Sequence, residues 1–326
     1  MFNRWVAPLR SILYPVTSLQ HLSEVLELDL DLTRTAYDIL LKNKISESYI
    51  HDIVSPSAYR SFGQSLHDLH AFALSTVLYE ADKAFSFSDD GILPVLEKMI
   101  HQSNAALELE TTVHGLSEQD DGKWILALKP NDDLTSDQNI GDVYQIFDEV
   151  IIATPLVRSE INFKTISVID FPEDIDYKPV FLTFLISNSG LSAQYFNLNS
   201  GEKVPNRIFG DQPSFQEINL VKPIVSETQN PNFTTSYLYR VTSPTLFKDE
   251  DVTALLGGSE PLWIHRLSIP HAYPHLHIRT ELPSVKLSNS LWSTGGIEAL
   301  GSSIELSTWM GKNVAGLVIE KLTRDM

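Results

Sequence analysis

The amino-acid sequence predicts an α+β fold, with a helical lobe, a mixed β-sheet and a long C-terminal helix. Residues 1–104 carry apolar side chains mainly at helical spacing, whereas the following residues form short β-prone runs separated by polar loops. The segment from Leu291 onward reads as a short strand, a glycine turn and an amphipathic helix. We therefore expect a helical lobe over 1–104 and a mixed-sheet domain with the C-terminal helix over 105–326.

The helices of the lobe are predicted from caps and apolar spacing. Thr17 and Gln20 have the spacing of a capping box, a second helix is expected from Thr33, and Pro94 stands at the first turn of another. The apolar positions of these helices are Leu19, Leu22, Val25 and Leu26, then Leu66, Leu69, Ala73, Leu74 and Val77, then Leu96, Met99 and Ile100.

Strands are expected from residue 105 onward. The run Val150 to Ala153 is continuously apolar and ends at Thr154-Pro155, which is typical of a strand buried on both faces. Further strands are predicted at Leu107 to Val113, Trp124 to Leu128, Val180 to Ile186, Tyr237 to Val241 and Trp263 to Ile269. The C-terminal helix is predicted to bury Leu306, Met310, Val314, Leu317 and Val318 on one face.

Composition narrows the class of function. The 326 residues carry a formal net charge of -18, which disfavours binding to nucleic acid or to anionic membranes through charge. There are no cysteines, so disulfides and thiolate chemistry are excluded. The first 19 residues contain Pro8, Arg10 and Pro15, an interruption that fits neither a signal peptide nor a membrane span. A small or apolar ligand fits this composition better than a polyanion.

A glycine turn precedes the predicted C-terminal helix. Gly295, Gly296 and Gly301 would let a ligand approach the backbone, and the N-terminus of a helix attracts phosphate or another electron-rich group. The alternative is a turn that only packs a helix against a strand, which is the commoner meaning of such a pattern.

Four short runs, in one order along the chain, carry a resemblance to a known family. They are YRSFGQS from Tyr59, DEVIIATPLVR from Asp148, AYPHL from Ala272 and the Gly-Ile-Glu turn at Gly296, which is followed by Ser302, Ser303, Glu305 and Ser307. These runs resemble elements of the prenylcysteine oxidases, also called prenylcysteine lyases. Phe62 stands at a tyrosine position of that family, and Arg60 lies one place later than its arginine.

The resemblance implies an α/β flavoprotein-like oxidoreductase. Its FAD-dependent reaction would cleave the thioether of prenylcysteine into cysteine, a prenyl aldehyde and hydrogen peroxide, with oxygen as electron acceptor, during breakdown of prenylated proteins. Residues implied to contact FAD are Gly295, Gly296, Ile297, Glu298, Thr154 and Pro155. Residues implied near the substrate, in a groove between the helical lobe and the sheet, are Tyr59, Arg60, Phe62, Gln64, Tyr273 and His275. No catalytic residue is assigned.

Two departures from that family bear on the cofactor. Its members carry a G-x-G-x-x-G turn that lets the backbone approach the FAD pyrophosphate, but here no glycine has another glycine two positions on. We therefore expect the dinucleotide-binding segment to be missing from these residues, because it lies upstream, lies in a separate chain or has been lost. The run FSFSDDGILPV from Phe85 keeps only Gly91 of a glycine-rich element expected near the flavin.

Histidines offer weaker candidates. His271, His275 and His277 would bring imidazoles together, but no carboxylate partner is near in sequence, so cleft or structural histidines are favoured over a metal site. His67 and His70 are expected on a solvated helix edge rather than in a proton relay. Asn232 begins a glycosylation sequon, which has meaning only if the chain is secreted.

Two functions therefore remain open. One is an active oxidase of lysosome or vacuole, as the resemblance implies, whose FAD-binding segment lies elsewhere. The other is a non-catalytic remnant or binding module, cytoplasmic in one alternative, that keeps an isoprenoid-binding fold without FAD.

Overall fold

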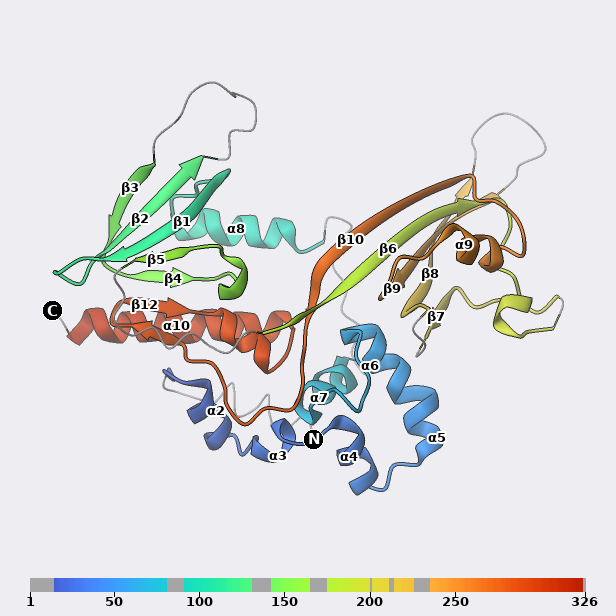
Figure 1. Ribbon diagram of the computed structural model, residues 1–326, viewed down its shortest axis with the longest axis horizontal. Helices are drawn as coiled ribbons and strands as arrows, with labels where there is room; N and C mark the ends of the chain where they lie inside the picture. Colours follow the sequence, from blue (N-terminus) through green and yellow to red (C-terminus); the bar gives the residue numbers. More distant parts are fainter. Residues whose placement is uncertain are drawn as a thin grey trace. The chain divides into compact units, whose positions relative to one another are not determined.

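The computed structural model describes residues 15–80, 91–130, 142–164, 175–199, 201–210, 214–225 and 235–324. The chain forms two compact units, and each of them is discontinuous in sequence. Unit 1 comprises residues 1–28, 78–174 and 281–326, and unit 2 comprises residues 29–77 and 175–280. The division of the chain into residues 1–104 and 105–326, expected from the sequence, stays a prediction. The α+β class and the long C-terminal helix are confirmed (Figure 1).

Unit 1 contains two small sheets and three helices among its described residues. The helices are α2 (Leu19–Val25), α8 (Leu93–Ser103) and α10 (Ile304–Arg324). One sheet has the order β3-β2-β1-β5, from Val143–Phe147, Trp124–Pro130, Thr111–Glu118 and Asn162–Lys164. The other has the order β11-β12-β4, from Lys286–Ser288, Leu291–Ser293 and Val150–Ile152. The predicted strand at 150 is present as β4, which pairs in parallel with β12, but it is not buried on both faces, because Ile151 is 45% exposed while Val150 and Ile152 are buried.

A core of apolar residues joins the two sheets of unit 1. Trp124 and Leu291 are fully buried in it, together with Leu116, Val150, Ile152 and Leu287. Helix α10 is held to the sheet through Lys321, whose ammonium binds the Glu149 carboxylate and the Ser290 hydroxyl at 2.8 Å. The indole N–H of Trp292 donates to the other oxygen of Glu149 at 2.7 Å. A half-buried ion pair thus fixes α10 against β12.

Unit 2 combines a helical layer with a five-stranded sheet (Figure 1). The helices are α3 (Asp29–Leu32), α4 (Ala36–Lys42), α5 (Glu47–Tyr49), a π-helical turn (Ile50–Val54), α6 (Ser55–Phe62), α7 (Ala71–Glu80) and α9 (Asp249–Leu255). The sheet has the order β10-β6-β9-β8-β7, from Trp263–Pro274, Tyr177–Ser187, Thr235–Ser243, Glu217–Val225 and Arg207–Phe209, all antiparallel. Helix α9 packs its buried Val252 and Leu255 onto that sheet.

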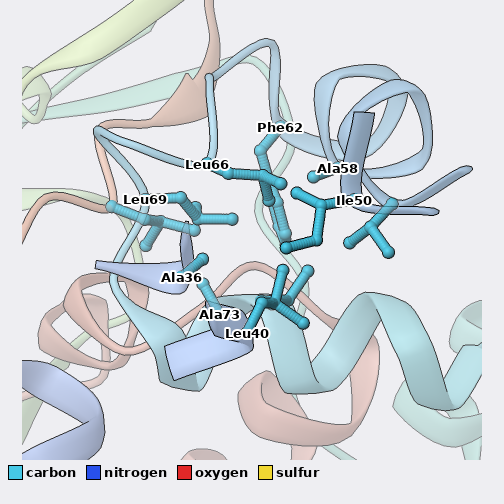
Figure 2. Packing of buried hydrophobic residues seen from close by; sticks show 11 residues of the cluster. Ala36, Leu40, Ile50, Ala58, Phe62, Leu66, Leu69 and Ala73 are labelled. Carbon is cyan, nitrogen blue, oxygen red and sulfur yellow. The ribbon is translucent and has the colours of Figure 1, made fainter. Parts of the chain in front are cut away.

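Apolar side chains of α4, α6 and α7 form the core of the helical layer. Figure 2 shows Ala36, Leu40, Ile50, Ala58, Phe62, Leu66, Leu69 and Ala73 converging in this cluster. Leu276, just after β10, is buried in the same cluster, so the chain beyond the long strand is anchored to the helices. Burial of this kind stabilises by about 25 cal/mol per Å² of apolar surface.

Several helix boundaries differ from those predicted. The first helix is capped by Ser18, whose hydroxyl accepts from the Gln20 N–H, and not by Thr17. The second is capped by Thr35 rather than starting at Thr33. The stripe at 66–77 spans a turn and then α7, because the buried Nδ1 of His70 accepts the Ala73 N–H and begins that helix. His70 is therefore no solvated helix edge.

Candidate functional site

The residues implied to contact FAD come together in unit 1. Strands β4 and β12 are paired in parallel with Ile152 opposite Ser293, so their carboxyl ends lie at one edge of the sheet. The Thr294 N–H donates to the Ile152 carbonyl at 3.1 Å, which places Thr154-Pro155 beside the glycine turn. Ligands of parallel sheets bind at this kind of edge.

Gly295 lies in close backbone contact with the other strand. A Cβ at this position would stand 3.2 Å from the Thr154 carbonyl oxygen and 3.5 Å from the Pro155 Cα. Its own N–H donates to the Ser293 hydroxyl at 3.2 Å. The need for glycine here therefore comes from the approach of two protein segments, whatever ligand binds beyond them.

Gly296 faces the interior of unit 1. It is buried, and a Cβ there would stand 2.9 Å from Pro283 Cβ and 3.4 Å from Leu19 Cδ1. Ile297 is also buried, whereas Thr154 is exposed and Glu298 is partly exposed. Of the six residues implied at the cofactor, the solvent-facing ones are thus Thr154, Pro155, Gly295 and Glu298.

The glycine turn does not begin the long helix, contrary to the sequence prediction. Gly295 to Ala299 form a 3₁₀ helix, and α10 starts at Ile304. The hydroxyl of Ser303 accepts the Leu306 N–H at 3.2 Å and caps α10 there. The positive end of the helix dipole therefore belongs to Ser303, eight positions after Gly295.

The residues implied near the substrate come together in unit 2, at the junction of α6 and β10. Gln64 is fully buried and makes three hydrogen bonds with backbone: its amide nitrogen donates to the Pro274 carbonyl at 3.0 Å and to the Phe62 carbonyl at 3.2 Å, and its amide oxygen accepts from the Leu276 N–H at 2.9 Å. The run from Tyr59 and the run from Ala272 are joined by this one side chain. Gln64 positions the junction rather than presenting a free amide to a ligand.

The aromatic residues of this junction differ in exposure. Phe62 is 3% exposed and belongs to the helical core, so it lines no groove. Tyr59 and Tyr273 are partly exposed. Burial raises the pKa of Tyr273 above its usual value, which keeps the phenol protonated at neutral pH. Tyr59 and Tyr273 are therefore the aromatic candidates that can offer a hydrogen bond to a ligand.

His275 follows β10 with its N–H bonded to the Asp176 carbonyl at 2.6 Å. Its ring lies edge-on to that of His277, with centroids 5.1 Å apart. Burial, together with the charge of Lys178, lowers the pKa of His275, so the ring is neutral at pH 7. Across the described part of the chain, no group of three or more histidine and acidic residues could hold a metal ion.

Sequence reasoning missed a charged cluster beside the same junction. Glu217 on β8 is almost fully buried and pairs with Arg207 on β7 and Arg240 on β9, with Arg60 of α6 at 4.0 Å. Strand β7 has only three residues, too few for an alternating pattern to reveal it. Arg60 was the one member that the resemblance pointed out.

Other calls fall outside these two groups. Asn232 and the residues 85–90 lie outside the described residues, and Gly91 adopts a positive φ of 70° in a turn before α8. In unit 1, a surface pocket of about 280 Å³ lies on the sheet β1-β2-β3. It is lined by Ala106, Glu108, Thr111, Val113, Leu126, Leu128, Gln145 and Phe147, none of which belongs to the predicted site. None of the described helices combines the length and apolarity needed to cross a membrane.

The class of protein follows from a comparison of the whole chain with families. The model of the family described as prenylcysteine lyase matches residues 12–326, and the chain belongs to this family. The chain is 25% identical over 303 residues to human prenylcysteine oxidase 1, covering 89% of this chain and 57% of that protein. It is 24% identical over 304 residues to mouse prenylcysteine oxidase 1-like, covering 90% of this chain and 59% of that protein. The chain thus spans somewhat more than half the length of these relatives.

Two solved structures superpose partly on the chain. A redesigned putrescine oxidase superposes with a TM-score of 0.49 at 14% identity, covering 90% of this chain and 69% of that one. An oxidoreductase from Methanosarcina mazei also superposes with a TM-score of 0.49, at 12% identity, covering 94% of this chain and 70% of that one.

Proposed function

We propose that this chain carries the substrate-side part of a FAD-dependent prenylcysteine oxidase. The observation that supports this most is the family match over residues 12–326, in which the two implied residue groups each come together within one unit. When bound, FAD would supply the hydride acceptor for the prenyl carbon attached to sulfur, with oxygen as the final electron acceptor and with cysteine, a prenyl aldehyde and hydrogen peroxide as products.

The protein's own contribution begins at the edge formed by β4 and β12. Thr154 is exposed there, and Pro155, Gly295 and Glu298 are partly exposed, so backbone and small side chains can meet one edge of a flat ring system. These residues fit a part of FAD. The sequence has no G-x-G-x-x-G turn, so the pyrophosphate contacts that such a turn provides must come from elsewhere.

A second candidate is a binding module that holds a prenylated ligand without FAD. The lack of a phosphate-binding glycine motif in these 326 residues favours it. The two candidates make different predictions for flavin. In both, the ligand is a prenylated thioether, and the apolar groove that would take its chain remains a prediction.

Flavin content separates the candidates. We expect the purified chain to lose FAD on gel filtration, because the adenosine and pyrophosphate contacts contribute much of the affinity. Fusion to, or mixing with, a dinucleotide-binding domain of a related oxidase should restore yellow flavin if the first function is correct. Stoichiometric flavin on the chain alone would contradict the expectation, and failure of every combination to hold flavin would favour the binding module.

A variant tests where the flavin lies. Thr154→Arg adds bulk and charge at the exposed end of β4 and should abolish flavin retention in the fusion. Thr323→Arg, on an exposed turn of α10, is the matched control and should retain flavin. Equal flavin absorbance in both variants would remove the edge of β4 and β12 from the cofactor site. Thermal melting of each variant shows whether a loss reflects unfolding.

A further inference from the structure

Four charged side chains meet on one edge of unit 2 around a single carboxylate. Glu217 has one oxygen at 2.9 Å from the Arg240 guanidinium, while the other oxygen binds Arg207 and lies 4.0 Å from Arg60. Strands β7, β8 and β9 are neighbours in the sheet, and α6 supplies the fourth member. One carboxylate neutralises one of three positive charges, which leaves the cluster a formal charge of +2.

The exposure of the four side chains decides where that charge acts. The Glu217 side chain is 6% exposed, whereas those of Arg60, Arg240 and Arg207 are 33%, 36% and 50% exposed. The negative group is thus enclosed, and the positive groups reach solvent. A guanidinium presents several N–H donors in a plane, so it can bind Glu217 and still offer donors to a second carboxylate. The cluster has the composition of an oxyanion receptor.

One aromatic ring, that of Phe209, holds two of the guanidinium groups in place. The carbon centres of Arg60 and Arg207 lie 5.2 Å and 5.0 Å from the centroid of the Phe209 ring. Contacts of this kind fix a flexible arginine at little cost in solvation. A preorganised arginine pair loses less conformational entropy when it binds an anion, which favours a binding role over a loose surface ion pair.

The next polar groups also point to an incomplete network. Gln216 is 1% exposed, and its Oε1 has no hydrogen-bond partner among the described residues; nor has the Nε of Arg240. Buried polar atoms in folded proteins rarely lack a hydrogen-bond partner, because each unsatisfied atom lowers the folding stability by about 1–3 kcal/mol. A ligand or water that joins the cluster would satisfy them.

Tyr273 connects the cluster with the junction of α6 and β10. Its phenol feels the charges of Arg60, Glu217 and Arg240, and its ring lies 3.4 Å from where a Cβ at Gly63 would stand. Gly63 has a φ of 62°, and its Cβ would come within 2.5 Å of the Gln216 amide. Glycine at this position therefore lets Gln216 and Tyr273 pack closely against the end of α6.

We propose that Arg60, Arg207 and Arg240, with Tyr273, bind the carboxylate of the amino-acid end of a prenylated thioether. The proposal rests on the proposed function for the identity of the ligand, whereas the receptor for a carboxylate rests on the cluster itself. Two planar donors facing one carboxylate give bidentate recognition. The prenyl chain would extend away from this charged edge.

The test compares S-farnesylcysteine with its methyl ester, which lacks the negative charge. Isothermal titration with the intact 326-residue chain should show tighter binding of the free acid, by about tenfold or more. Arg60→Gln should remove that difference and leave binding of the ester unchanged. Arg60→Lys keeps the positive charge but loses the planar guanidinium donors, so it should recover part of the preference for the free acid. Lys222→Gln removes one exposed positive charge from β8 and is the matched control.

Each outcome bears on one of the two ideas. Equal binding of acid and ester in the unmodified chain, or an unchanged preference in Arg60→Gln, overturns the carboxylate site while leaving the proposed function standing. Binding of simple carboxylates such as octanoate that depends on Arg60, without any binding of prenyl thioethers, supports the carboxylate site and counts against the proposed function. No binding of any carboxylate overturns the inference. Urea unfolding of each variant confirms that it is folded.

Discussion

The glycine turn of unit 1 and the junction of α6 with β10 in unit 2 are both built from family-matched residues, but by different physical means. The turn uses small residues: Gly295 and Gly296 let backbone and proline pack closely. The junction uses a polar side chain: Gln64 bonds the backbone of both matched runs. A family-matched residue can therefore be required because it has no side chain, as at Gly295 and Gly296, or because its side chain makes hydrogen bonds, as at Gln64. The two regions should respond differently to substitution.

The largest effect is expected for Gln64→Ala. It leaves the Leu276 N–H and the Pro274 carbonyl without their partner in a buried place, which costs about 2–4 kcal/mol of unfolding free energy. Urea denaturation measures the loss. Ser65→Ala, next in sequence and exposed, should change stability by less than about 0.5 kcal/mol. A Gln64→Ala variant as stable as the parent would show that the junction needs no side-chain bond.

Gly63→Ala should cost about 1–3 kcal/mol. The residue ends α6 in the left-handed conformation, with φ of 62°, and the added methyl would meet the Gln216 amide. Differential scanning calorimetry against Gly190→Ala, where nothing lies within 4 Å of the added methyl, measures the difference. Equal melting temperatures for the two variants would show that alanine at position 63 causes no backbone or steric strain.

Gly296→Ala tests the other region and should cost about 1–2 kcal/mol. The new Cβ would stand 2.9 Å from Pro283 Cβ, so one of the two segments must shift. Chemical denaturation gives the value, and Gly311→Ala on α10, an open position, is the control. In the control, alanine in a helix should raise stability slightly. A neutral Gly296→Ala would contradict the close packing of Pro283 against this turn.

The smallest effect concerns pH. Burial holds the pKa of His275 below the usual value near 6.5, so the unfolded chain takes up a proton before the native one does. Its contribution to stability is therefore lost as pH falls below about 6.5 towards the native pKa. In His275→Gln the urea midpoint should fall less between pH 7.5 and pH 5.5 than in the parent. Parallel slopes would show that His275 is not the group responsible.

The sequence could predict what depends on local pattern. The apolar run at Val150 predicts a strand, and the structure has one there. The family resemblance placed Gln64 in one group with the segment at Pro274, and the structure joins them by a hydrogen bond. The sequence predicted a helix over the stripe at 66–77 but could not predict where α7 begins, because the apolar spacing continues through the preceding turn and the His70 imidazole sets the first turn of the helix. The Glu217 cluster was missed for a different reason. Its members come from four elements, and no spacing in sequence records a meeting of that kind.

Helices α8 and α10 show a further limit. Both have apolar stripes, but α10 buries Leu306, Met310 and Val314, whereas Leu93, Val95 and Met99 of α8 are more than half exposed. A stripe predicts that a helix has an apolar face, and it carries no information about what covers that face.

The interleaving of the two units sets the order in which they can be completed during synthesis. Unit 2 has all of its residues once position 280 has emerged, while unit 1 still lacks β11, β12 and α10. Until then β4 has no parallel partner, since Leu291 pairs with Val150 across the whole second half of unit 2. Folding of unit 2 shortens the effective loop between those strands and lowers the entropic cost of closing it. Unit 2 can therefore be completed during synthesis before unit 1, which needs residues from both the N-terminal and the C-terminal parts of the chain.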